Sequence, residues 1–298
     1  MCGIVGLFAK TPEFAAQIGR YLTPMLLAMT DRGPDSAGVA IYRNPVPAGQ
    51  IKLTVLATAP ELSWVEFETA LCKAFPAVTG VTLNGNHAII TATAASAELT
   101  DWIHASQPGV RINSSGSTIE IYKQKGLPAE VARNFGVADF VGSHALGHTR
   151  MATESAVTTE HSHPFSTGDD LCLVHNGSLC NHNRLRTQLR KRGIHFTTDN
   201  DSEVAAGYLT WRLREGDTLE AALDSAIGAL DGFYTFAIGT REGFAVLRDP
   251  IACKPAVIAE TEQWVAMASE YRAIAGLPGA DQAASWEPAP GRVYSWSH

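Results

Sequence analysis

The chain has 298 residues, of which 45% are hydrophobic and 18% charged, and its formal net charge is -7. This length suits one large domain or two small ones and can bury a core without covalent cross-links. The acidic balance and the lack of a basic tract argue against a nucleic-acid surface. No stretch approaches the roughly 18 apolar residues of a membrane span.

The cysteine pattern indicates reduced thiols. Five cysteines are scattered without a CxxC pair, which does not fit a disulfide framework, a zinc site or an iron–sulfur ligand set. The N-terminus lacks a basic n-region, and Lys10 and Pro12 interrupt its apolar stretch, so no signal peptide is expected. We therefore expect a cytoplasmic location. The cysteines are Cys2, Cys72, Cys172, Cys180 and Cys253.

The first part of the chain is predicted to form a strand, a helix, a turn and further strands. The run CGIVGLFA at 2–9 has the length and apolar content of a buried strand. Helical periodicity follows over 13–29, where Pro24 predicts a kink or a break. The segment TDRGPDSAG at 30–38 is dense in turn residues. The next expected strands are 39–43 and 51–57.

The pattern of expected elements changes between about 60 and 125. Helical segments at 61–75 and 96–106 alternate with short strands. Ser96 stands where an N-cap of the second helix is expected. The alternation predicts a small α/β lobe at 60–125, inserted in a main domain that covers 2–298.

Residues with chemical functions are concentrated after position 138. They lie in the segments DFVGSHALGHTRMAT, HSHPF, DLCLVHNGSLCN and TDNDSEV, at 139–153, 161–165, 170–181 and 198–204. The elements expected after them are helices at 204–214 and 218–229 and a strand pair around 232–250.

Cys2 directly follows the start methionine, and two interpretations of it stay open. Methionine is usually trimmed before a small residue, which would leave a free α-amine on the same residue as a thiol. That amine has a pKa of about 8 in model peptides and can act as general base for its own side chain. The alternative is that cysteine serves as a small core residue. Taken alone, Cys2 favours the core role.

Two further segments have both a structural and a functional interpretation. An apolar strand leads into GHTRMAT, where Arg150 either binds a carboxylate in a bidentate manner or forms a surface ion pair, and the segment alone favours the ion pair. Asn176–Gly177 after an apolar run is a strong hairpin signal. The same pair can direct a side-chain N–H and a backbone N–H at one point, as an oxyanion hole requires.

The segment TDNDSEV runs into a predicted helix. Asp201 or Ser202 can act as its N-cap, and a carboxylate there can also bind a substrate ammonium. An arginine and an aspartate together match the carboxylate and the ammonium of a free α-amino acid. With a thiol nucleophile and an oxyanion hole, the segments describe an attack on the side-chain amide of such an amino acid.

In combination, these segments resemble the class II glutamine amidotransferases, which are N-terminal-nucleophile hydrolases. Each motif alone is unspecific, but their order after an N-terminal cysteine is highly specific. The matching pieces are CGIVG, DRGPDSAG, GHTRMAT, HNG and DNDSE, with RDPIACKP at 248–255 similar to a late family segment.

The resemblance implies a catalytic mechanism. Cys2 would attack the side-chain amide of L-glutamine, and its α-amine would shuttle the proton. Asn176 and Gly177 would stabilise the oxyanion. Ammonia would leave first, and water would then hydrolyse a γ-glutamyl thioester to glutamate.

The resemblance also implies a substrate pocket and a fold. Arg150 would bind the glutamine carboxylate and Asp201 its ammonium, while Thr153 and the backbone around His175 would shape the pocket. The segment 32–35 would support the loop of the nucleophile without taking part in chemistry. The implied fold is α+β, a four-layer α/β/β/α sandwich of mostly antiparallel sheets with the small lobe inserted.

The likeness is strongest to the stand-alone amidotransferase-like subunits of glutamate synthase and N-methylglutamate synthase systems. The chain lacks a dinucleotide glycine motif, a phosphate loop and iron–sulfur cysteines. We therefore expect no cofactor in this chain and a separate synthase subunit that accepts the ammonia. By analogy with glutamate synthase, that partner would carry a flavin and an iron–sulfur cluster.

Three alternatives stay open at this stage. The thioester could transfer its glutamyl group to an amine such as methylamine, as in an N-methylglutamate synthase subunit. The chain could be a non-catalytic regulatory subunit. A metal hydrolase is less favoured, because the histidines lack the HExxH pattern. Those histidines are His144, His148, His161 and His163.

Overall fold

The computed structural model describes residues 2–152 and 157–298. Its first sheet has, within those residues, seven strands in the order β15-β13-β14-β1-β8-β2-β7, and every neighbouring pair is antiparallel. The strands are β1 (Gly3–Ala9), β2 (Ser36–Tyr42), β7 (Ile119–Lys125), β8 (His144–Arg150), β13 (Val257–Glu260), β14 (Trp264–Ala268) and β15 (Ala284–Trp286).

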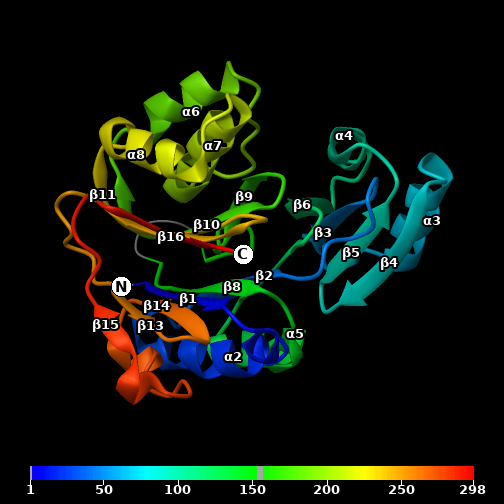
Figure 1. Cartoon of the computed structure of the whole chain (residues 1–298). Coiled ribbons are helices and arrows are strands. Elements are labelled where there is room, and N and C mark those ends of the chain that lie inside the picture. Colours follow the sequence, from blue (N-terminus) through cyan, green and yellow to red (C-terminus); the bar gives the residue numbers. More distant parts are fainter. Residues whose placement is uncertain (1, 153–156) are drawn as a thin grey trace.

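A second antiparallel sheet faces the first one (Figure 1). In the described part of the chain it has five strands in the order β16-β12-β11-β10-β9. The strands are β9 (Phe165–Gly168), β10 (Leu171–Leu179), β11 (Gly232–Gly239), β12 (Gly243–Arg248) and β16 (Val293–Ser297).

The alternation of side chains along β1 shows why its apolar run is continuous. Ile4 and Phe8 pack between the two sheets, whereas Val5, Leu7 and Ala9 pack against helices on the opposite face. Successive side chains of a strand point to opposite faces, so a strand that is covered on both faces needs apolar residues at every position.

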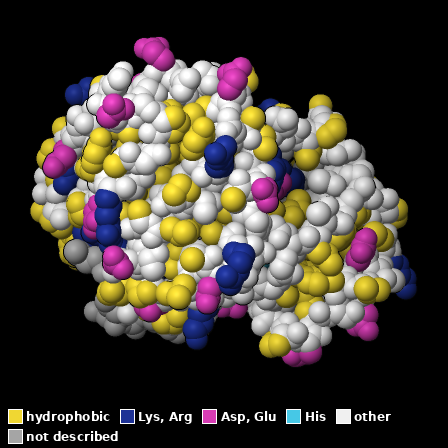
Figure 2. Space-filling model, turned by 90° about the horizontal axis from the view of Figure 1, so that it is seen from below, with side chains coloured by type: hydrophobic (Ala, Val, Ile, Leu, Met, Phe, Trp, Pro, Cys, Tyr) yellow, Lys and Arg dark blue, Asp and Glu magenta, His cyan; other side chains and the backbone are white. Residues whose placement is uncertain are grey.

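Helices cover the outer face of each sheet (Figure 1). Figure 2 shows the lower face of the molecule, where apolar side chains are interspersed with charged ones. The helices under the first sheet are α1 (Pro12–Ala15), α2 (Ile18–Ala28) and α5 (Pro128–Phe135), and those over the second are α6 (His182–Arg190), α7 (Asp201–Arg214) and α8 (Leu219–Ala229). Short 3₁₀ turns are η1 (Thr30–Arg32), η2 (Val137–Asp139), η3 (Tyr271–Ala273) and η4 (Ala280–Gln282).

Pro24 does not interrupt its helix. The structure keeps Pro24 inside α2 and instead separates α1 from α2 after Ala15. Pro24 is exposed, so its ring meets solvent and not the sheet. The predicted break at this position was therefore wrong, since α2 continues through Pro24 to Ala28 although the proline removes one backbone hydrogen bond.

A smaller sheet with two helices forms a lobe beside the sandwich (Figure 1). Its boundaries differ from the predicted 60–125, because β3 pairs with β5 and β6 inside the lobe, whereas β7 pairs with β2 in the first sheet. The predicted N-cap Ser96 is the first helical residue of α4, and Ala95 holds the cap position. The elements are β3 (Ile51–Ala57), α3 (Trp64–Ala74), β4 (Val78–Asn84), β5 (His87–Ala92), α4 (Ser96–Ser106) and β6 (Val110–Gly116).

Asp170 joins the lobe to the sandwich. Its carboxylate accepts hydrogen bonds from the backbone N–H groups of Ser117 (2.8 Å), Thr118 (2.8 Å) and Ile119 (3.1 Å), just after β6. These bonds hold the pKa of Asp170 below its usual range despite burial, which acts in the opposite direction. None of the described helices is long and apolar enough to cross a bilayer.

Candidate active site

Cys2 precedes the central strand of the first sheet. In the β1–β8 pairing, Gly3 lies opposite Thr149, so the antiparallel register brings Cys2 next to Arg150, the last residue of β8. The thiol is partly exposed, and its sulfur lies 3.9 Å from the carbonyl oxygen of Met151. The sheet thus presents Cys2 and Arg150 together at one end.

Two side chains hold the main-chain carbonyl of Cys2. Arg32 donates from Nε at 2.9 Å and Asn176 donates from Nδ2 at 3.1 Å. Arg32 is buried, and its Nη1 donates to Glu270 at 2.7 Å. The segment 32–35 was predicted to support the loop of the nucleophile, and the structure shows that Arg32 does so through a direct bond.

Asn176 and Gly177 lie inside β10 and not in a turn. The pairing of β10 with β11 continues through both residues to Leu179, so the hairpin interpretation was wrong. Gly177 has a φ of +153°, and a Cβ there would lie 2.0 Å from the carbonyl oxygen of Phe233. Only glycine fits this backbone, because φ is positive and the neighbouring strand is too close.

Arg150 is buried and lies beside a carboxylate. Asp35 accepts a hydrogen bond from the backbone of Ala152 at 2.8 Å and donates its own N–H to the carbonyl of Arg150 at 3.1 Å. Burial lowers the pKa of the Arg150 guanidinium, while the charges of Cys2 and Asp35 raise it. Thr153, which was predicted to shape the pocket, lies outside the described residues.

Asp201 is the first residue of α7 but not its cap. Asn200 is the N-cap and accepts from the backbone of Ser202 at 2.9 Å, so the capping roles predicted for Asp201 or Ser202 were wrong. One carboxylate oxygen of Asp201 accepts from the backbone of Leu179 at 2.9 Å. Its side chain keeps 22% of its surface exposed, which leaves it accessible at the end of β10.

Three buried histidines surround the oxyanion candidates. His175 contacts Ser202 Oγ through Nδ1 at 2.8 Å, and His163 contacts the same oxygen through Nε2 at 2.9 Å. His148 bonds through Nε2 to the carbonyl of His175 at 3.0 Å. Burial lowers the pKa of His148 to about 3 and lowers the pKa of His163 and His175 as well.

The histidines at the site and those of the predicted metal set have hydrogen-bond partners within the protein. Among the described residues, no set of three His, Cys, Asp or Glu side chains is arranged to hold a metal ion. His144 bonds to the carbonyl of Thr240 at 2.9 Å, and His161 contacts Thr158 and Asp199.

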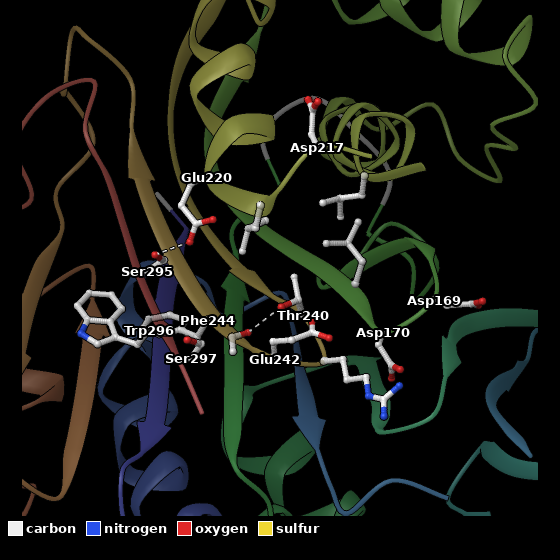
Figure 3. Close-up of a pocket in the computed structure, with 15 residues that line it drawn as sticks. Asp169, Asp170, Asp217, Glu220, Thr240, Glu242, Phe244, Ser295, Trp296 and Ser297 are labelled. Atoms are coloured by element: carbon white, nitrogen blue, oxygen red, sulfur yellow. Dashed lines mark hydrogen bonds between the residues drawn. The ribbon is translucent and has the colours of Figure 1, made fainter. Parts of the chain in front are cut away.

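A cavity of about 540 Å³ lies at the other end of the second sheet (Figure 3). Two of its carboxylates already have partners within the protein: Asp217 pairs with Arg212, and Glu220 accepts from Ser295 at 2.8 Å. None of the predicted site residues lines this cavity. We therefore place the candidate active site at Cys2 and not in this cavity.

Comparison with known proteins identifies the family. A family model described as a glutamine amidotransferase domain matches residues 148–276. The chain is 52% identical over 300 residues to the glutamine amidotransferase-like protein GlxB of Rhizobium meliloti (strain 1021), covering 100% of this chain and 99% of the relative. The chain belongs to the class II glutamine amidotransferases.

More distant relatives share part of the chain or only its fold. An amidophosphoribosyltransferase of Methanocaldococcus jannaschii is 32% identical over 178 residues, covering 58% of this chain and 38% of the relative. The structure of glutamine phosphoribosylpyrophosphate amidotransferase from B. subtilis, complexed with ADP and GMP, superimposes with a TM-score of 0.62 at 21% identity. That match covers 99% of this chain and 47% of the other, so the fold is that of an amidotransferase.

In this class II glutamine amidotransferase, the structure brings most of the predicted site residues close together. Cys2 and Asn176 are in direct contact, and the register of β1 with β8 places Arg150 next to Cys2. Asp201 lies at the same end of β10 as Asn176 and Gly177, where its carboxylate accepts from the backbone of Leu179 and lies 3.8 Å from Nδ1 of His175. Sequence reasoning missed the bridging hydroxyl of Ser202, because a serine in the first turn of a helix is typical of capping.

Proposed function

We propose that the chain hydrolyses L-glutamine to glutamate and ammonia through a thioester on Cys2. The observation that carries the proposal is the contact between Cys2 and Asn176, which joins the two sheets at the nucleophile. Membership of the class II glutamine amidotransferases supports it.

The proposed reaction begins with a proton transfer within Cys2. The α-amine, freed by removal of Met1, takes the thiol proton, and the thiolate attacks the amide carbon. Negative charge develops on the amide oxygen. The side-chain amide of Asn176 carries two hydrogens, one of which binds the Cys2 carbonyl. The other hydrogen and the backbone N–H of Gly177 stabilise the oxyanion.

The second half of the reaction releases both products. The Cys2 ammonium gives its proton to the leaving nitrogen, the carbon–nitrogen bond breaks, and ammonia departs. Water then attacks the γ-glutamyl thioester, its proton returns to the sulfur, and glutamate is released. The Cys2 thiol and α-amine are restored for the next cycle.

Two charged residues bind the amino-acid head of glutamine in this proposal. Arg150 binds the α-carboxylate, because its guanidinium can form two parallel hydrogen bonds to a carboxylate. Asp201 binds the α-ammonium with the part of its carboxylate that stays exposed. His175 contributes to the pocket by fixing the backbone of β10.

The proposal extends to a separate synthase subunit that receives the ammonia. The support is the likeness of the chain to amidotransferase subunits of glutamate synthase systems and its match to GlxB over the full length of that relative. Met151, whose carbonyl faces the Cys2 sulfur, is exposed and offers an apolar contact at the mouth of the site. We assign the flavin and the iron–sulfur cluster to that partner.

The test compares glutamine hydrolysis by the unsubstituted protein, Cys2→Ala and a matched control, Cys72→Ala, which removes an exposed thiol of the lobe. Assays run with and without the partner that co-purifies from the source cells. We expect glutamate from the unsubstituted protein and from Cys72→Ala, and none from Cys2→Ala. Equal rates for Cys2→Ala would overturn the proposal. Methylamine in the assay separates hydrolysis from transfer, because transfer would yield N-methylglutamate.

A further inference from the structure

The hydroxyl of Ser202 lies between two imidazoles and a carboxylate. Its oxygen is 2.9 Å from Nε2 of His163, 2.8 Å from Nδ1 of His175 and 3.3 Å from the nearest oxygen of Asp201. The Ser202 side chain is almost completely buried, with 1% of its surface exposed. A serine in the first turn of a helix is ordinarily solvated or capping, so this environment calls for a separate explanation.

The protons of this cluster can be assigned from the atoms that lack partners. In the described part of the chain, the buried ring atoms without a hydrogen bond are Nδ1 of His148, Nδ1 of His163 and Nε2 of His175. A neutral imidazole has one N–H donor and one acceptor nitrogen. An unsatisfied buried donor is costly, so each unpartnered nitrogen is assigned as the acceptor.

That assignment determines the direction of every bond around Ser202. His148 donates from Nε2 to the carbonyl of His175, while His163 and His175 both donate to Ser202 Oγ. A hydroxyl accepts up to two bonds and donates one. With its two acceptor positions used, Ser202 donates its only proton to Asp201. Every buried N–H and O–H of the cluster then has an acceptor.

The same bonds fix the backbone on both sides of Asn176. His148 holds the carbonyl that precedes Asn176. On the other side, a Cβ on Gly177 would lie 2.7 Å from Nε2 of His175, so the ring of His175 lies directly against the α-carbon of Gly177. The position of this ring is set by its Nδ1 bond to Ser202.

We propose that Ser202 is a positioning residue that holds the oxyanion donors of β10 at a fixed position relative to the carboxylate of Asp201. The role rests on the proposed glutaminase function, in which Asn176 and Gly177 stabilise the oxyanion and Asp201 binds the ammonium. One hydroxyl connects the two groups: it receives the His175 ring that supports Gly177, and it donates to Asp201. Ser202 itself touches neither substrate nor sulfur in this proposal.

The kinetic test replaces Ser202 by Ala, which is nearly isosteric, and by Thr, which keeps the hydroxyl. The matched control is Ser114→Ala, which removes a buried hydroxyl that has no partner among the described residues. Misplacing oxyanion donors affects the transition state more than the bound substrate. We expect Ser202→Ala to lower kcat for glutamine hydrolysis about 10- to 100-fold, with KM changed less, Ser202→Thr to recover most of the activity, and Ser114→Ala to match the unsubstituted protein.

A second readout does not depend on activity. Nitrogen NMR of the ring-labelled full-length protein distinguishes protonated from unprotonated imidazole nitrogens. We expect neutral rings with Nδ1–H in His175 and Nε2–H in His148 and His163. In Ser202→Ala, the signals of His163 and His175 should shift while those of His148 stay in place.

The two readouts separate the failure of this inference from the failure of the proposed function. An unsubstituted protein that hydrolyses no glutamine, alone or with its partner, would refute the proposed function, and the NMR signals would then decide the role of Ser202. Unchanged signals of His163 and His175 in Ser202→Ala would overturn the inference. Unchanged kcat in Ser202→Ala in an active enzyme would overturn it as well.

Discussion

The side-chain amide of Asn176 donates a hydrogen bond of 3.1 Å to the main-chain carbonyl oxygen of Cys2. Asn176 belongs to the second sheet and Cys2 precedes the central strand of the first. The bond therefore sets the position of the nucleophile relative to the strand that holds the oxyanion donors. An amide has two hydrogens, so Asn176 can support the nucleophile and the oxyanion together.

Asn176→Asp should lower kcat for glutamine hydrolysis about 100- to 1,000-fold, the usual effect of losing an oxyanion donor. The change is isosteric, but it replaces the donating nitrogen by an oxygen that repels the Cys2 carbonyl. The matched control is Asn84→Asp, where the lost bond also joins a side-chain amide to a carbonyl, that of Phe135, at 3.1 Å. Equal activities of the two variants would contradict the role of Asn176.

Arg32→Ala should reduce kcat about tenfold, because the carbonyl of Cys2 loses one of its two side-chain donors and the thiol is held less firmly. Arg272→Ala is the control, since Arg272 also pairs with Glu270, at 2.7 Å, but is 47% exposed. Surface ion pairs contribute about 0–1 kcal/mol. Steady-state kinetics of both variants make the comparison, and a loss of activity in Arg272→Ala of the same size would argue against a role specific to Arg32.

Gly177→Ala should destabilise the protein by about 2 kcal/mol or more, because the new Cβ meets the Phe233 carbonyl at 2.0 Å in a backbone conformation unsuited to alanine. Gly228→Ala is the matched control in α8, where nothing lies within 4 Å of an added Cβ. That change should stabilise the helix by up to about 1 kcal/mol. Urea unfolding measures both, and a neutral Gly177→Ala would show that β10 is less constrained than described.

The sequence predicted the elements around the site better than the contacts between them. The run at 2–9 became β1, because a strand buried on both faces requires continuous apolar residues. Asn176–Gly177 was ambiguous because local turn propensity and long-range strand pairing compete, and here the pairing with β11 prevails. The Arg32–Cys2 bond joins distant parts of the chain, and no local pattern encodes such a contact.

The buried histidines should make the protein sensitive to mild acid. Burial lowers the pKa of His87, His144 and His148 to about 3 and also lowers that of His163 and His175. The unfolded chain, with histidine pKa values near 6.5, then binds protons that the folded protein does not. Their contribution to stability is complete above about pH 6.5 and is lost as the pH falls toward the folded pKa values.

The free energy of unfolding should therefore fall between pH 6.5 and pH 5, where carboxylates contribute little. Each fully protonated histidine of the unfolded chain adds a slope of about 1.4 kcal/mol per pH unit. Urea titrations at pH 7.5, 6.5 and 5.5 give the dependence, and proton uptake on unfolding provides an independent count. A free energy that stays constant across this range would show that these rings are protonated in the folded state.

The central claim is that Cys2, with its amine free, forms the glutamyl thioester. The most direct measurement mixes the native protein with L-glutamine, quenches it in acid and records the mass of the N-terminal peptide. We predict a peptide that lacks Met1 and carries, on Cys2, an adduct equal to glutamine minus ammonia, with no adduct in Cys2→Ala. An active protein that retains Met1, or an adduct that persists in Cys2→Ala, would contradict the account.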